Sequence, residues 1–239
     1  MFKKHPGFNF IFFLIFAVQL MSQSDTLTDM FLFPGAKFIS KPLITLSLLI
    51  WLLYHTGYKG RYSKSIALGL LAGLCGDVFL MFTDRYPDFF LAGLISFLIG
   101  HIFYIRAFYI DYKLNKSVHP GHRKNAIIAY SFFVIIFMFL LIPNLKISLI
   151  SPVLLYAITI SLMGIVAVCR FGRVNAASYK MVVGGAILFV ISDAILAYNK
   201  FVNAIPFAGF FIMFTYMIAQ YLITYGNIER KIKRRVEDI

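Results

Sequence analysis

The chain has 239 residues, of which 60% are hydrophobic and only 14% are charged, and its formal net charge is +13. Soluble domains average about 25% charged residues, so this composition excludes an ordinary soluble domain and predicts a multi-pass membrane protein. The same basicity in a soluble protein would suggest a nucleic-acid partner. Here the basic residues lie in short segments between apolar runs, where they orient a membrane chain, and we expect no nucleic-acid partner.

Eight apolar segments follow one another along the chain, most of them near the length of about 20 residues with which a helix crosses a bilayer. The sequence therefore predicts an all-α integral membrane bundle of eight transmembrane helices, which forms a single transmembrane domain over residues 1–239. The spans lie near residues 8–21, 42–56, 64–83, 89–110, 125–143, 148–169, 179–198 and 204–226.

The basic residues are distributed very unequally between the two ends of these spans. With the N-terminus inside, seventeen lie in inner segments, five in outer segments, and Arg106 within a span. Cytoplasmic segments are enriched in Lys and Arg, so both termini are predicted to be cytoplasmic, in the inner membrane if the protein is bacterial. The basic tail Arg230–Arg235 is interpreted as a topology anchor at an anionic leaflet. The inner set is Lys3, Lys4, Lys59, Arg61, Lys64, Lys113, Lys116, Arg123, Lys124, Arg170, Arg173, Lys180, Arg230, Lys231, Lys233, Arg234 and Arg235, and the outer set is Lys37, Lys41, Arg85, Lys146 and Lys200.

A weak internal repeat appears at an offset of 116 residues, where Gly69 matches Gly185 and Asp77 matches Asp193. The offset contains four predicted spans, an even number, so two four-helix halves would run in the same direction as a parallel repeat. Both aspartates would then lie at a similar depth. Chance agreement among Gly, Ala and Leu is the alternative, because residues 1–60 and 120–175 show no clear match.

Asp77 and Asp193 each lie in the middle of an apolar span. A charged side chain at the centre of a membrane helix costs about 2.5–3.5 kcal/mol on insertion scales, so both acids are candidate functional residues. Gly69, Gly73 and Asp77 recur every four residues and share one helix face, where small residues let a neighbouring helix approach. The alternative is a structural role, in which each carboxyl group hydrogen-bonds neighbouring helices.

Other polar residues accompany the acids. His101 and Tyr104 of the fourth span are three residues apart and share one face beside Gly100. A lone membrane histidine is as readily a buried hydrogen-bond donor as a catalyst, so its candidacy depends on the two acids. Lys41, followed by Pro42, opens the second span, where it either snorkels to the interface or binds a lipid phosphate.

Several familiar chemistries lack a motif. The chain has no GxSxG, HExxH, Walker or CxxC motif, and Cys75 and Cys169 lie inside apolar runs without the spacing of metal ligands. A serine hydrolase, a zincin, an ATPase, a disulfide framework and a thiolate zinc site are therefore not predicted. Acid–base chemistry by carboxylates is what the sequence leaves.

Five strings in a fixed order distinguish the chain: Lys41-Pro42, Gly76-Asp77, Gly93-Leu94 through Phe97, Gly100 through Phe108 (GHIFYIRAF) and Ser192 through Phe201 (SDAILAYNKF). With them the chain resembles the YhhN/TMEM86 family of multi-pass membrane proteins from about Lys41 to about Gln220. That family includes lysoplasmalogenases. The resemblance implies hydrolysis of the vinyl ether bond of lysoplasmalogens to a fatty aldehyde and glycerophosphoethanolamine or glycerophosphocholine. It implies a lysophospholipid substrate and membrane lipid as partners.

Vinyl ether hydrolysis begins with protonation of the β-carbon and needs an acid that still holds its proton near neutral pH. Burial and a second carboxylate nearby both favour such a state. One of Asp77 and Asp193 would give the proton while the other, ionised, stabilises the cation and activates water. The scheme requires no metal or organic cofactor. His101 and Tyr104 would orient the acids or the water, Ser192 and Asn199 would hold the glycerol hydroxyl or the hemiacetal oxygen, and Lys41 and Lys200 would bind the phosphate.

Three other interpretations stay open at this point. A proton-coupled transporter also carries midplane carboxylates in repeat-related halves. A metal-dependent lipid hydrolase would use Asp77, His101 and Asp193 as a mononuclear site. A purely structural membrane protein would use the acids only to join helices. The headgroup and the oligomeric state are not predicted from the sequence.

Overall fold

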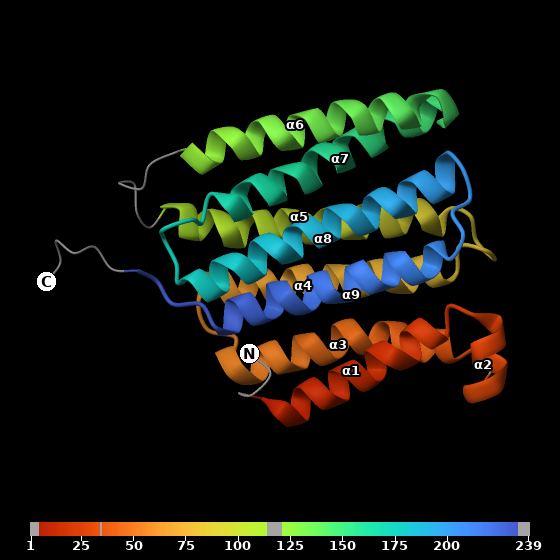
Figure 1. Cartoon of the computed structure of the whole chain (residues 1–239), viewed down its shortest axis with the longest axis horizontal. Coiled ribbons are helices and arrows are strands. Elements are labelled where there is room, and N and C mark those ends of the chain that lie inside the picture. Colours follow the sequence, from red (N-terminus) through yellow and green to blue (C-terminus); the bar gives the residue numbers. More distant parts are fainter. Residues whose placement is uncertain (1–4, 34, 114–120, 234–239) are drawn as a thin grey trace, which may run out of the picture.

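The computed structural model describes residues 5–33, 35–113 and 121–233. In this part of the chain the prediction of an all-α protein is confirmed, and the helices lie side by side along the long axis of the molecule (Figure 1). The short 3-10 turn η1 joins α6 to α7. The bounds are α1 (Pro6–Met21), α2 (Asp25–Phe31), α3 (Ala36–Thr56), α4 (Arg61–Met81), α5 (Phe89–Lys113), α6 (Gly121–Leu141), η1 (Ile142–Asn144), α7 (Ile147–Val168), α8 (Ala176–Phe201) and α9 (Ala208–Ile228).

Seven helices, α3 to α9, are long and apolar enough to cross a membrane, and the protein is an integral multi-pass membrane protein. The first apolar helix, α1, has 16 residues. At 1.5 Å per residue that is about 24 Å, short of a hydrocarbon core of about 30 Å. The predicted count of eight spans is therefore not confirmed. Helix α2, which has 7 residues, was not predicted from the sequence. Ser24 caps it by accepting a hydrogen bond from the backbone N–H of Leu27.

The second span begins earlier than predicted. Helix α3 starts at Ala36, directly after Gly35, whose φ of 88° lies in the left-handed region, and Pro42 lies inside the helix. The prediction that Pro42 opens this span is wrong, because a proline near a helix beginning removes one backbone hydrogen bond but keeps a helical φ. Lys41 consequently lies within α3, and its side chain reaches Asp77 of α4 inside the bundle.

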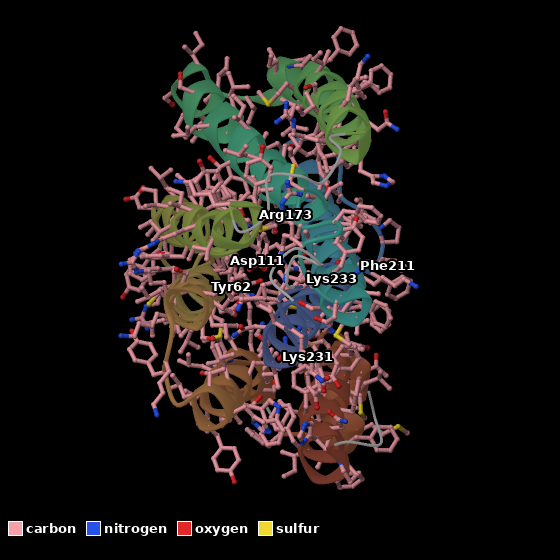
Figure 2. The ribbon with its side chains drawn as sticks, turned by 90° about the vertical axis from the view of Figure 1, so that its left-hand side faces the viewer. Tyr62, Asp111, Arg173, Phe211, Lys231 and Lys233 are labelled. Carbon is pink, nitrogen blue, oxygen red and sulfur yellow. The ribbon has the colours of Figure 1, made fainter. Side chains whose placement is uncertain are left out.

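Helix α9 lies at the centre of the bundle, in contact with α1, α3, α4 and α8, whereas α6 lies at the edge against α7 and α8 (Figure 2). Helices α4 and α5 approach each other through glycines. A Cβ added at Gly69 would lie 2.3 Å from Cε1 of Tyr104, and one added at Gly76 would lie 2.7 Å from the Phe97 ring. Small residues thus allow the close packing that sets α5 against the helix carrying Asp77.

One end of the bundle gathers the basic segments. The beginning of α4, the end of α5, the α7–α8 link and the end of α9 meet there, with Nε of Arg173 donating to the carbonyl oxygen of Tyr112 at 3.0 Å (Figure 2). Helix α1 also begins at this end, where Asn9 accepts a hydrogen bond from Tyr221 at 2.9 Å. We call it the inner end, and we call the opposite end, near α2, the outer end (Figure 1).

Arg230 does more than anchor the topology at the inner end. It donates from Nε to Oδ1 of Asp111 at 2.8 Å, and Arg170 donates from Nε to Oδ2 at 2.8 Å. Asp111 and Arg170 are both fully buried. This corrects the interpretation of Arg230 as a simple anchor, because a buried carboxylate requires charged partners. Five residues of the predicted inner set lie outside the described residues: Lys3, Lys4, Lys116, Arg234 and Arg235.

The predicted parallel repeat of two halves is not confirmed. Helix α3 packs on α4 and α4 on α5, just as α7 packs on α8 and α8 on α9. Consecutive antiparallel helices pack in this order in most bundles, so the likeness does not require a repeat. The two aspartates, moreover, have different surroundings.

Candidate active site at the outer end

Asp77 lies near the outer end of α4 and is 1% exposed. Its Oδ2 accepts hydrogen bonds from the hydroxyl of Tyr216 at 2.7 Å and from Oγ1 of Thr45 at 3.0 Å. The ammonium nitrogen of Lys41 lies 3.7 Å from Oδ1. Helices α3 and α9 thus supply an ion pair and two hydrogen bonds that compensate the burial of this carboxyl group.

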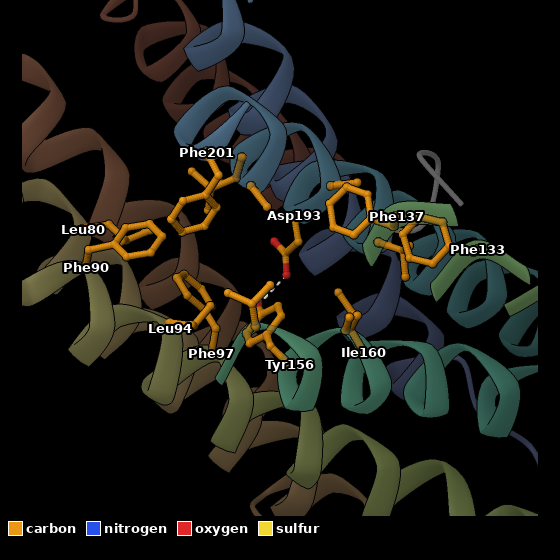
Figure 3. A pocket seen from close by; sticks show the side chains of 16 residues that line it. Leu80, Phe90, Leu94, Phe97, Phe133, Phe137, Tyr156, Ile160, Asp193 and Phe201 are labelled. Carbon is orange, nitrogen blue, oxygen red and sulfur yellow. Dashed lines mark hydrogen bonds between the residues drawn. The ribbon is translucent and has the colours of Figure 1, made fainter. Parts of the chain in front are cut away.

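Asp193, on α8, has fewer partners. Tyr156 of α7 donates a short hydrogen bond to its Oδ2 (Figure 3). Its side chain is 15% exposed, and among the described residues no Lys or Arg nitrogen lies within 4.0 Å of it. A basic side chain does approach, because Nε2 of His101 lies 3.8 Å from Oδ2. Asp193 is therefore an acid with one hydroxyl donor and without a permanent cation beside it.

His101 lies behind Asp193 and is 1% exposed. Its Nδ1 lies 2.5 Å from the carbonyl oxygen of Phe97, and since a carbonyl can only accept, Nδ1 carries the hydrogen. In the neutral ring Nε2 then holds a lone pair, and this atom has no hydrogen-bond partner in the described parts of the chain. Two acceptors that face each other in a buried space repel unless a proton or a water lies between them. At 3.8 Å the two atoms are beyond a direct hydrogen bond, so within the described residues Nε2 of His101 is an unpaired acceptor beside Asp193.

Both aspartates line one polar cavity between α3, α4, α5, α8 and α9, with an empty volume of ≈ 810 Å³. The two acids therefore share one interior space, Asp77 from α4 and Asp193 from α8. Six of the eight predicted site residues line this cavity: Asp77, Asp193, Lys41, Ser192, Asn199 and Lys200. His101 and Tyr104 lie outside its lining.

The predicted binding residues of α8 are partly engaged by the protein itself. Ser192 donates from Oγ to the carbonyl oxygen of Ile212 at 3.1 Å, which joins α8 to α9. Oδ1 of Asn199 accepts the backbone N–H of Ile205 at 2.8 Å, so the NH2 group of Asn199 is left to face the cavity. Nζ of Lys200 lies 5.3 Å from the centroid of the Phe90 ring. Asn199 and Lys200 can thus still offer donors to a ligand, whereas the hydroxyl proton of Ser192 is used.

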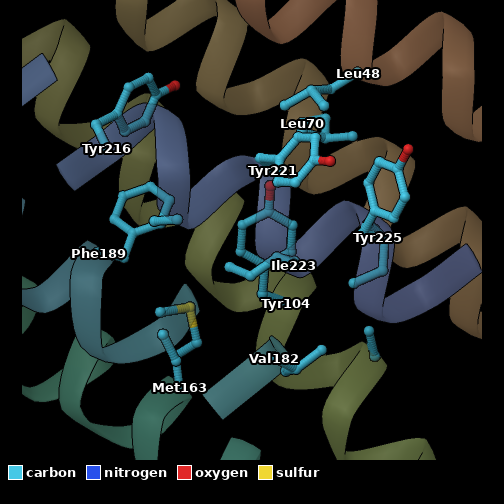
Figure 4. Packing of buried hydrophobic residues seen from close by; sticks show 14 of the residues in the cluster. Leu48, Leu70, Tyr104, Met163, Val182, Phe189, Tyr216, Tyr221, Ile223 and Tyr225 are labelled. Atoms are coloured by element: carbon cyan, nitrogen blue, oxygen red, sulfur yellow. The ribbon is translucent and has the colours of Figure 1, made fainter. Parts of the chain in front are cut away.

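Tyr104 reaches the site only through other side chains. Its hydroxyl donates to Oε1 of Gln220 at 2.6 Å, and Nε2 of Gln220 donates to the Tyr216 hydroxyl at 3.2 Å, which in turn donates to Asp77. Tyr104 and Tyr216 lie in the same buried cluster (Figure 4). Tyr104 is 1% exposed and lies outside the lining of the polar cavity, so it supports Asp77 through Gln220 and Tyr216 and does not face the cavity itself.

Sequence reasoning missed four side chains of the site: Thr45, Tyr156, Tyr216 and Gln220. Each is a polar residue inside an apolar helix, which is a detectable signal. The chain has 14 tyrosines, however, and other polar residues of these helices, such as Ser47, Ser96 and Thr159, bond the backbone of their own helix. Only the packing of α3, α7 and α9 singles out these four.

A second, apolar cavity adjoins the polar one (Figure 3). It lies between α5, α6, α7 and α8, has an empty volume of ≈ 610 Å³, and is lined by side chains such as Phe133, Phe137, Ala157, Ile160 and Ala194. Apart from Tyr156 and Asp193, every residue of its lining is apolar. Asp193 lines both cavities, so the acid stands where an apolar space meets a polar one.

The alternative of a mononuclear metal site on Asp77, His101 and Asp193 was tested against the geometry. Within residues 5–33, 35–113 and 121–233, no group of three His, Cys, Asp or Glu side chains is close enough to hold a metal ion. The two acids lie on opposite helices with separate hydroxyl partners. The donor set that this alternative needs is therefore not assembled.

Comparison with known proteins places the chain among membrane proteins of one family. Lysoplasmalogenase TMEM86A of Bos taurus is 30% identical over 169 residues, which is 70% of this chain and 66% of the relative. Lysoplasmalogenase TMEM86A of Homo sapiens is 29% identical over 170 residues, with the same shares of 70% and 66%. Lysoplasmalogenase TMEM86B of Rattus norvegicus is 29% identical over 191 residues, 77% of this chain and 69% of the relative.

The matched region spans 66% of the length of the first two relatives, slightly less than two thirds. No solved structure matches the chain. The model of the YhhN family matches residues 36–227, from the beginning of α3 almost to the end of α9, and so takes in both aspartates, the whole lining of the apolar cavity and that of the polar cavity except Gln23. On this match over most of its length, the chain belongs to the YhhN family.

Proposed function

We propose that the protein hydrolyses the vinyl ether bond of lysoplasmalogens, which are single-chain ether lipids, to a fatty aldehyde and a glycerophospho-alcohol. The proposal is carried by the position of Asp193 at the junction of the apolar and polar cavities. A lysoplasmalogen is divided in the same way, because its vinyl ether bond joins an apolar chain to a polar glycerophosphate. Membership of the YhhN family and the lysoplasmalogenase names of the relatives support this activity.

Asp193 acts as the general acid in this mechanism. The first step transfers a proton to the β-carbon of the vinyl ether, so a neutral carboxyl group must lie beside the bond. Asp193 faces the cavity junction with one donated hydrogen bond and no Lys or Arg within 4.0 Å among the described residues. The unpaired lone pair of His101 Nε2 lies 3.8 Å from Asp193, beyond a direct hydrogen bond, and it disfavours a negative charge there, which makes His101 a positioning residue that keeps the acid neutral.

Asp77 acts as the ionised partner. An ammonium group at 3.7 Å and two donated hydrogen bonds suit a carboxylate better than a neutral carboxyl group. Protonation of the β-carbon leaves an oxocarbenium ion at the neighbouring carbon, and the negative charge of Asp77 across the polar cavity stabilises it. Water then adds to this carbon, gives a proton back to Asp193, and the hemiacetal collapses to aldehyde and alcohol.

The two cavities divide the binding of the substrate. The alkenyl chain enters the apolar cavity between α6, α7 and α8, where only Tyr156 and Asp193 are polar. The glycerol occupies the polar cavity, where the NH2 group of Asn199 and the ammonium group of Lys200 are donors, and the phosphate lies at Lys41, on the lining of that cavity. This division holds the vinyl ether against Asp193, and correct placement of a reacting bond lowers the barrier substantially.

Purified protein in detergent tests the proposal, with lysoplasmenylethanolamine as substrate and aldehyde release as the readout. The wild-type protein is expected to release aldehyde. Asp193→Asn keeps the shape of the side chain but removes the acid proton, and it should lower kcat by about 10³-fold. Asp88→Asn is the matched control, because Asp88 is exposed at the start of α5 and lines neither cavity.

Two outcomes would contradict the proposal. Undiminished aldehyde release by Asp193→Asn would remove this residue from the chemistry. Substrate movement in sealed vesicles without any aldehyde release in detergent would favour the proton-coupled transporter, because a carrier needs two compartments whereas an enzyme does not.

A further inference from the structure

A third space, the outer chamber, continues the polar cavity toward the outer end of the bundle. Its polar lining consists of Gln19, Gln23, Lys37, Lys41 and Asp84, and its empty volume is ≈ 490 Å³. Gln23 and Lys41 line both this chamber and the polar cavity. The three spaces therefore form a series from the apolar cavity, past Asp193, through the polar cavity and past Lys41 into the outer chamber.

The charges of the outer chamber are of both signs. Lys37 and Lys41 bring two ammonium groups and Asp84 brings one carboxylate. Nζ of Lys41 lies 3.7 Å from Asp77, beyond the range of about 2.7–3.2 Å for a direct hydrogen bond, so its N–H groups are not consumed by that contact. No Lys or Arg nitrogen of the described residues comes within 4.0 Å of the carboxylate of Asp84. The chamber thus offers separate places for an anion and for a cation.

One wall of the chamber comes from outside the matched family region. Gln19 lies in the last turn of α1 and Gln23 follows the helix, whereas the family model begins at residue 36. Gln19 is 1% exposed, and its amide oxygen accepts a hydrogen bond from Oγ of Ser40 at 2.5 Å. Gln23 is half-buried, and its Nε2 lies 3.4 Å from the backbone oxygen of Gln19. These hydrogen bonds hold both amides in place, so the end of α1 and the residues after it complete the chamber.

We propose that the outer chamber is a headgroup site for a zwitterionic phospholipid, with the phosphate at Lys37 and Lys41 and the terminal ammonium group at Asp84. The inference deepens the proposed function, on which it rests for the lysolipid. Along such a lipid the groups follow in the order chain, vinyl ether, glycerol, phosphate and ammonium. The linings follow in the same order, from Phe133 through Asp193 and Lys41 to Asp84.

Binding of non-hydrolysable lipids tests the headgroup site independently of catalysis. Saturated 1-alkyl lysophospholipids that carry either an ethanolamine phosphate or an ethanol phosphate headgroup, and so share the same phosphodiester charge, are titrated into full-length protein in detergent, and thermal shifts give the Kd values. The wild-type protein should bind the ethanolamine lipid about fivefold more tightly, as expected for a partly exposed ion pair. Asp84→Asn should remove this preference by weakening only the ethanolamine lipid.

Two further variants sharpen the test. Asp88→Asn, four residues further along at the same end, should keep the wild-type preference. Lys37→Gln should weaken both lipids alike, because both carry the phosphate. An Asp84→Asn protein that retains the preference, or that loses affinity for both lipids equally, would overturn the assignment. Free phosphoethanolamine that binds as tightly as the lysolipid would overturn it in favour of a site for a soluble headgroup.

The two proposals fail in distinguishable ways. Absence of aldehyde release from lysoplasmenylethanolamine by the wild-type protein, with the headgroup preference intact, would refute the hydrolysis and leave a zwitterionic lipid site. Aldehyde release without any effect of Asp84→Asn on binding would refute the headgroup site and leave the hydrolysis.

Discussion

The two ends of the bundle bury acids in opposite ways. At the inner end Asp111 is fully buried, and Arg170 and Arg230 each donate to one of its carboxyl oxygens, while Arg170 also donates to Oγ of Ser178 at 2.9 Å. None of the three cavities described above includes Asp111. At the outer end Asp193 has one hydroxyl donor, a histidine at 3.8 Å, and a place in two cavities.

The comparison teaches that burial of a charge does not by itself mark a functional site in a membrane protein. Asp111 is the more deeply buried acid, yet both its carboxyl oxygens accept hydrogen bonds from arginines and no ligand can approach through the described cavities. Asp193 faces the unpaired Nε2 of His101 and adjoins two cavities. A place in a cavity wall separates both outer acids from the inner one, and Asp193 in addition lacks a Lys or Arg partner within 4.0 Å among the described residues.

The largest effect on stability is expected at the inner end. Asp111→Asn leaves Arg170 and Arg230 facing each other without a counter-charge, which should lower the free energy of unfolding by about 3–5 kcal/mol. Thermal unfolding in detergent measures the loss. Activity per folded molecule should be unchanged if the inner end is purely structural, so a selective loss of turnover with wild-type stability would break the comparison.

The next effect is expected in catalysis at the outer end. Asp77→Asn removes the negative charge that faces the oxocarbenium ion and should lower kcat by about 10²-fold. Thr45 and Tyr216 can still donate to the amide oxygen, and the ammonium group of Lys41 lines the polar cavity, so the loss of stability should be smaller than in Asp111→Asn. Equal losses of stability in Asp77→Asn and Asp111→Asn would mean that the acids at the two ends contribute to the fold in the same way, which would contradict the comparison.

A smaller effect is expected on substrate binding in the apolar cavity. Ala194→Leu puts added carbon atoms into the apolar cavity, which Ala194 lines beside Asp193. Displacing two methylene groups of a bound chain costs about 1.6 kcal/mol at about 0.8 kcal/mol each. In this variant the KM for a substrate with a long alkenyl chain should therefore rise about tenfold more than the KM for a substrate whose chain is shorter by several carbons. Aldehyde release measures both values. A uniform change for all chain lengths would place the alkenyl chain elsewhere.

The smallest effect is expected at the hydroxyl that holds Asp193. Tyr156→Phe removes one hydrogen bond, worth about 0.5–1.5 kcal/mol, and keeps the packing of the ring against His101 at a centroid distance of 5.4 Å. We expect kcat to fall about threefold to tenfold with KM nearly unchanged. Tyr62→Phe is the matched control at the inner end, because that hydroxyl has no hydrogen-bond partner among the described residues. Comparable losses of kcat in both variants would argue for a general effect on packing.

The sequence by itself determined the helical membrane architecture, most span positions and the two acids. Apolar length and composition are local properties, so residues 64–83 predict α4 and residues 89–110 predict α5 within a few positions. The cost of an isolated carboxylate in lipid likewise singles out Asp77 and Asp193 without any knowledge of their neighbours. Both acids line one cavity, and four of the polar residues predicted to accompany them, Lys41, Ser192, Asn199 and Lys200, line it as well.

The tertiary structure alone decided which partners each acid has and which spaces it faces. Tyr156 and Tyr216 lie far from Asp193 and Asp77 in the sequence, and only the rotation and height of α7 and α9 bring their hydroxyls to the carboxyl groups. The same holds for Gln23, which reaches the outer chamber because α1 packs against α3. Hydrophobic periodicity predicts which face of a helix is buried. It does not predict which side chain of a neighbouring helix that face contacts, because contacts between helices depend on packing across the whole bundle.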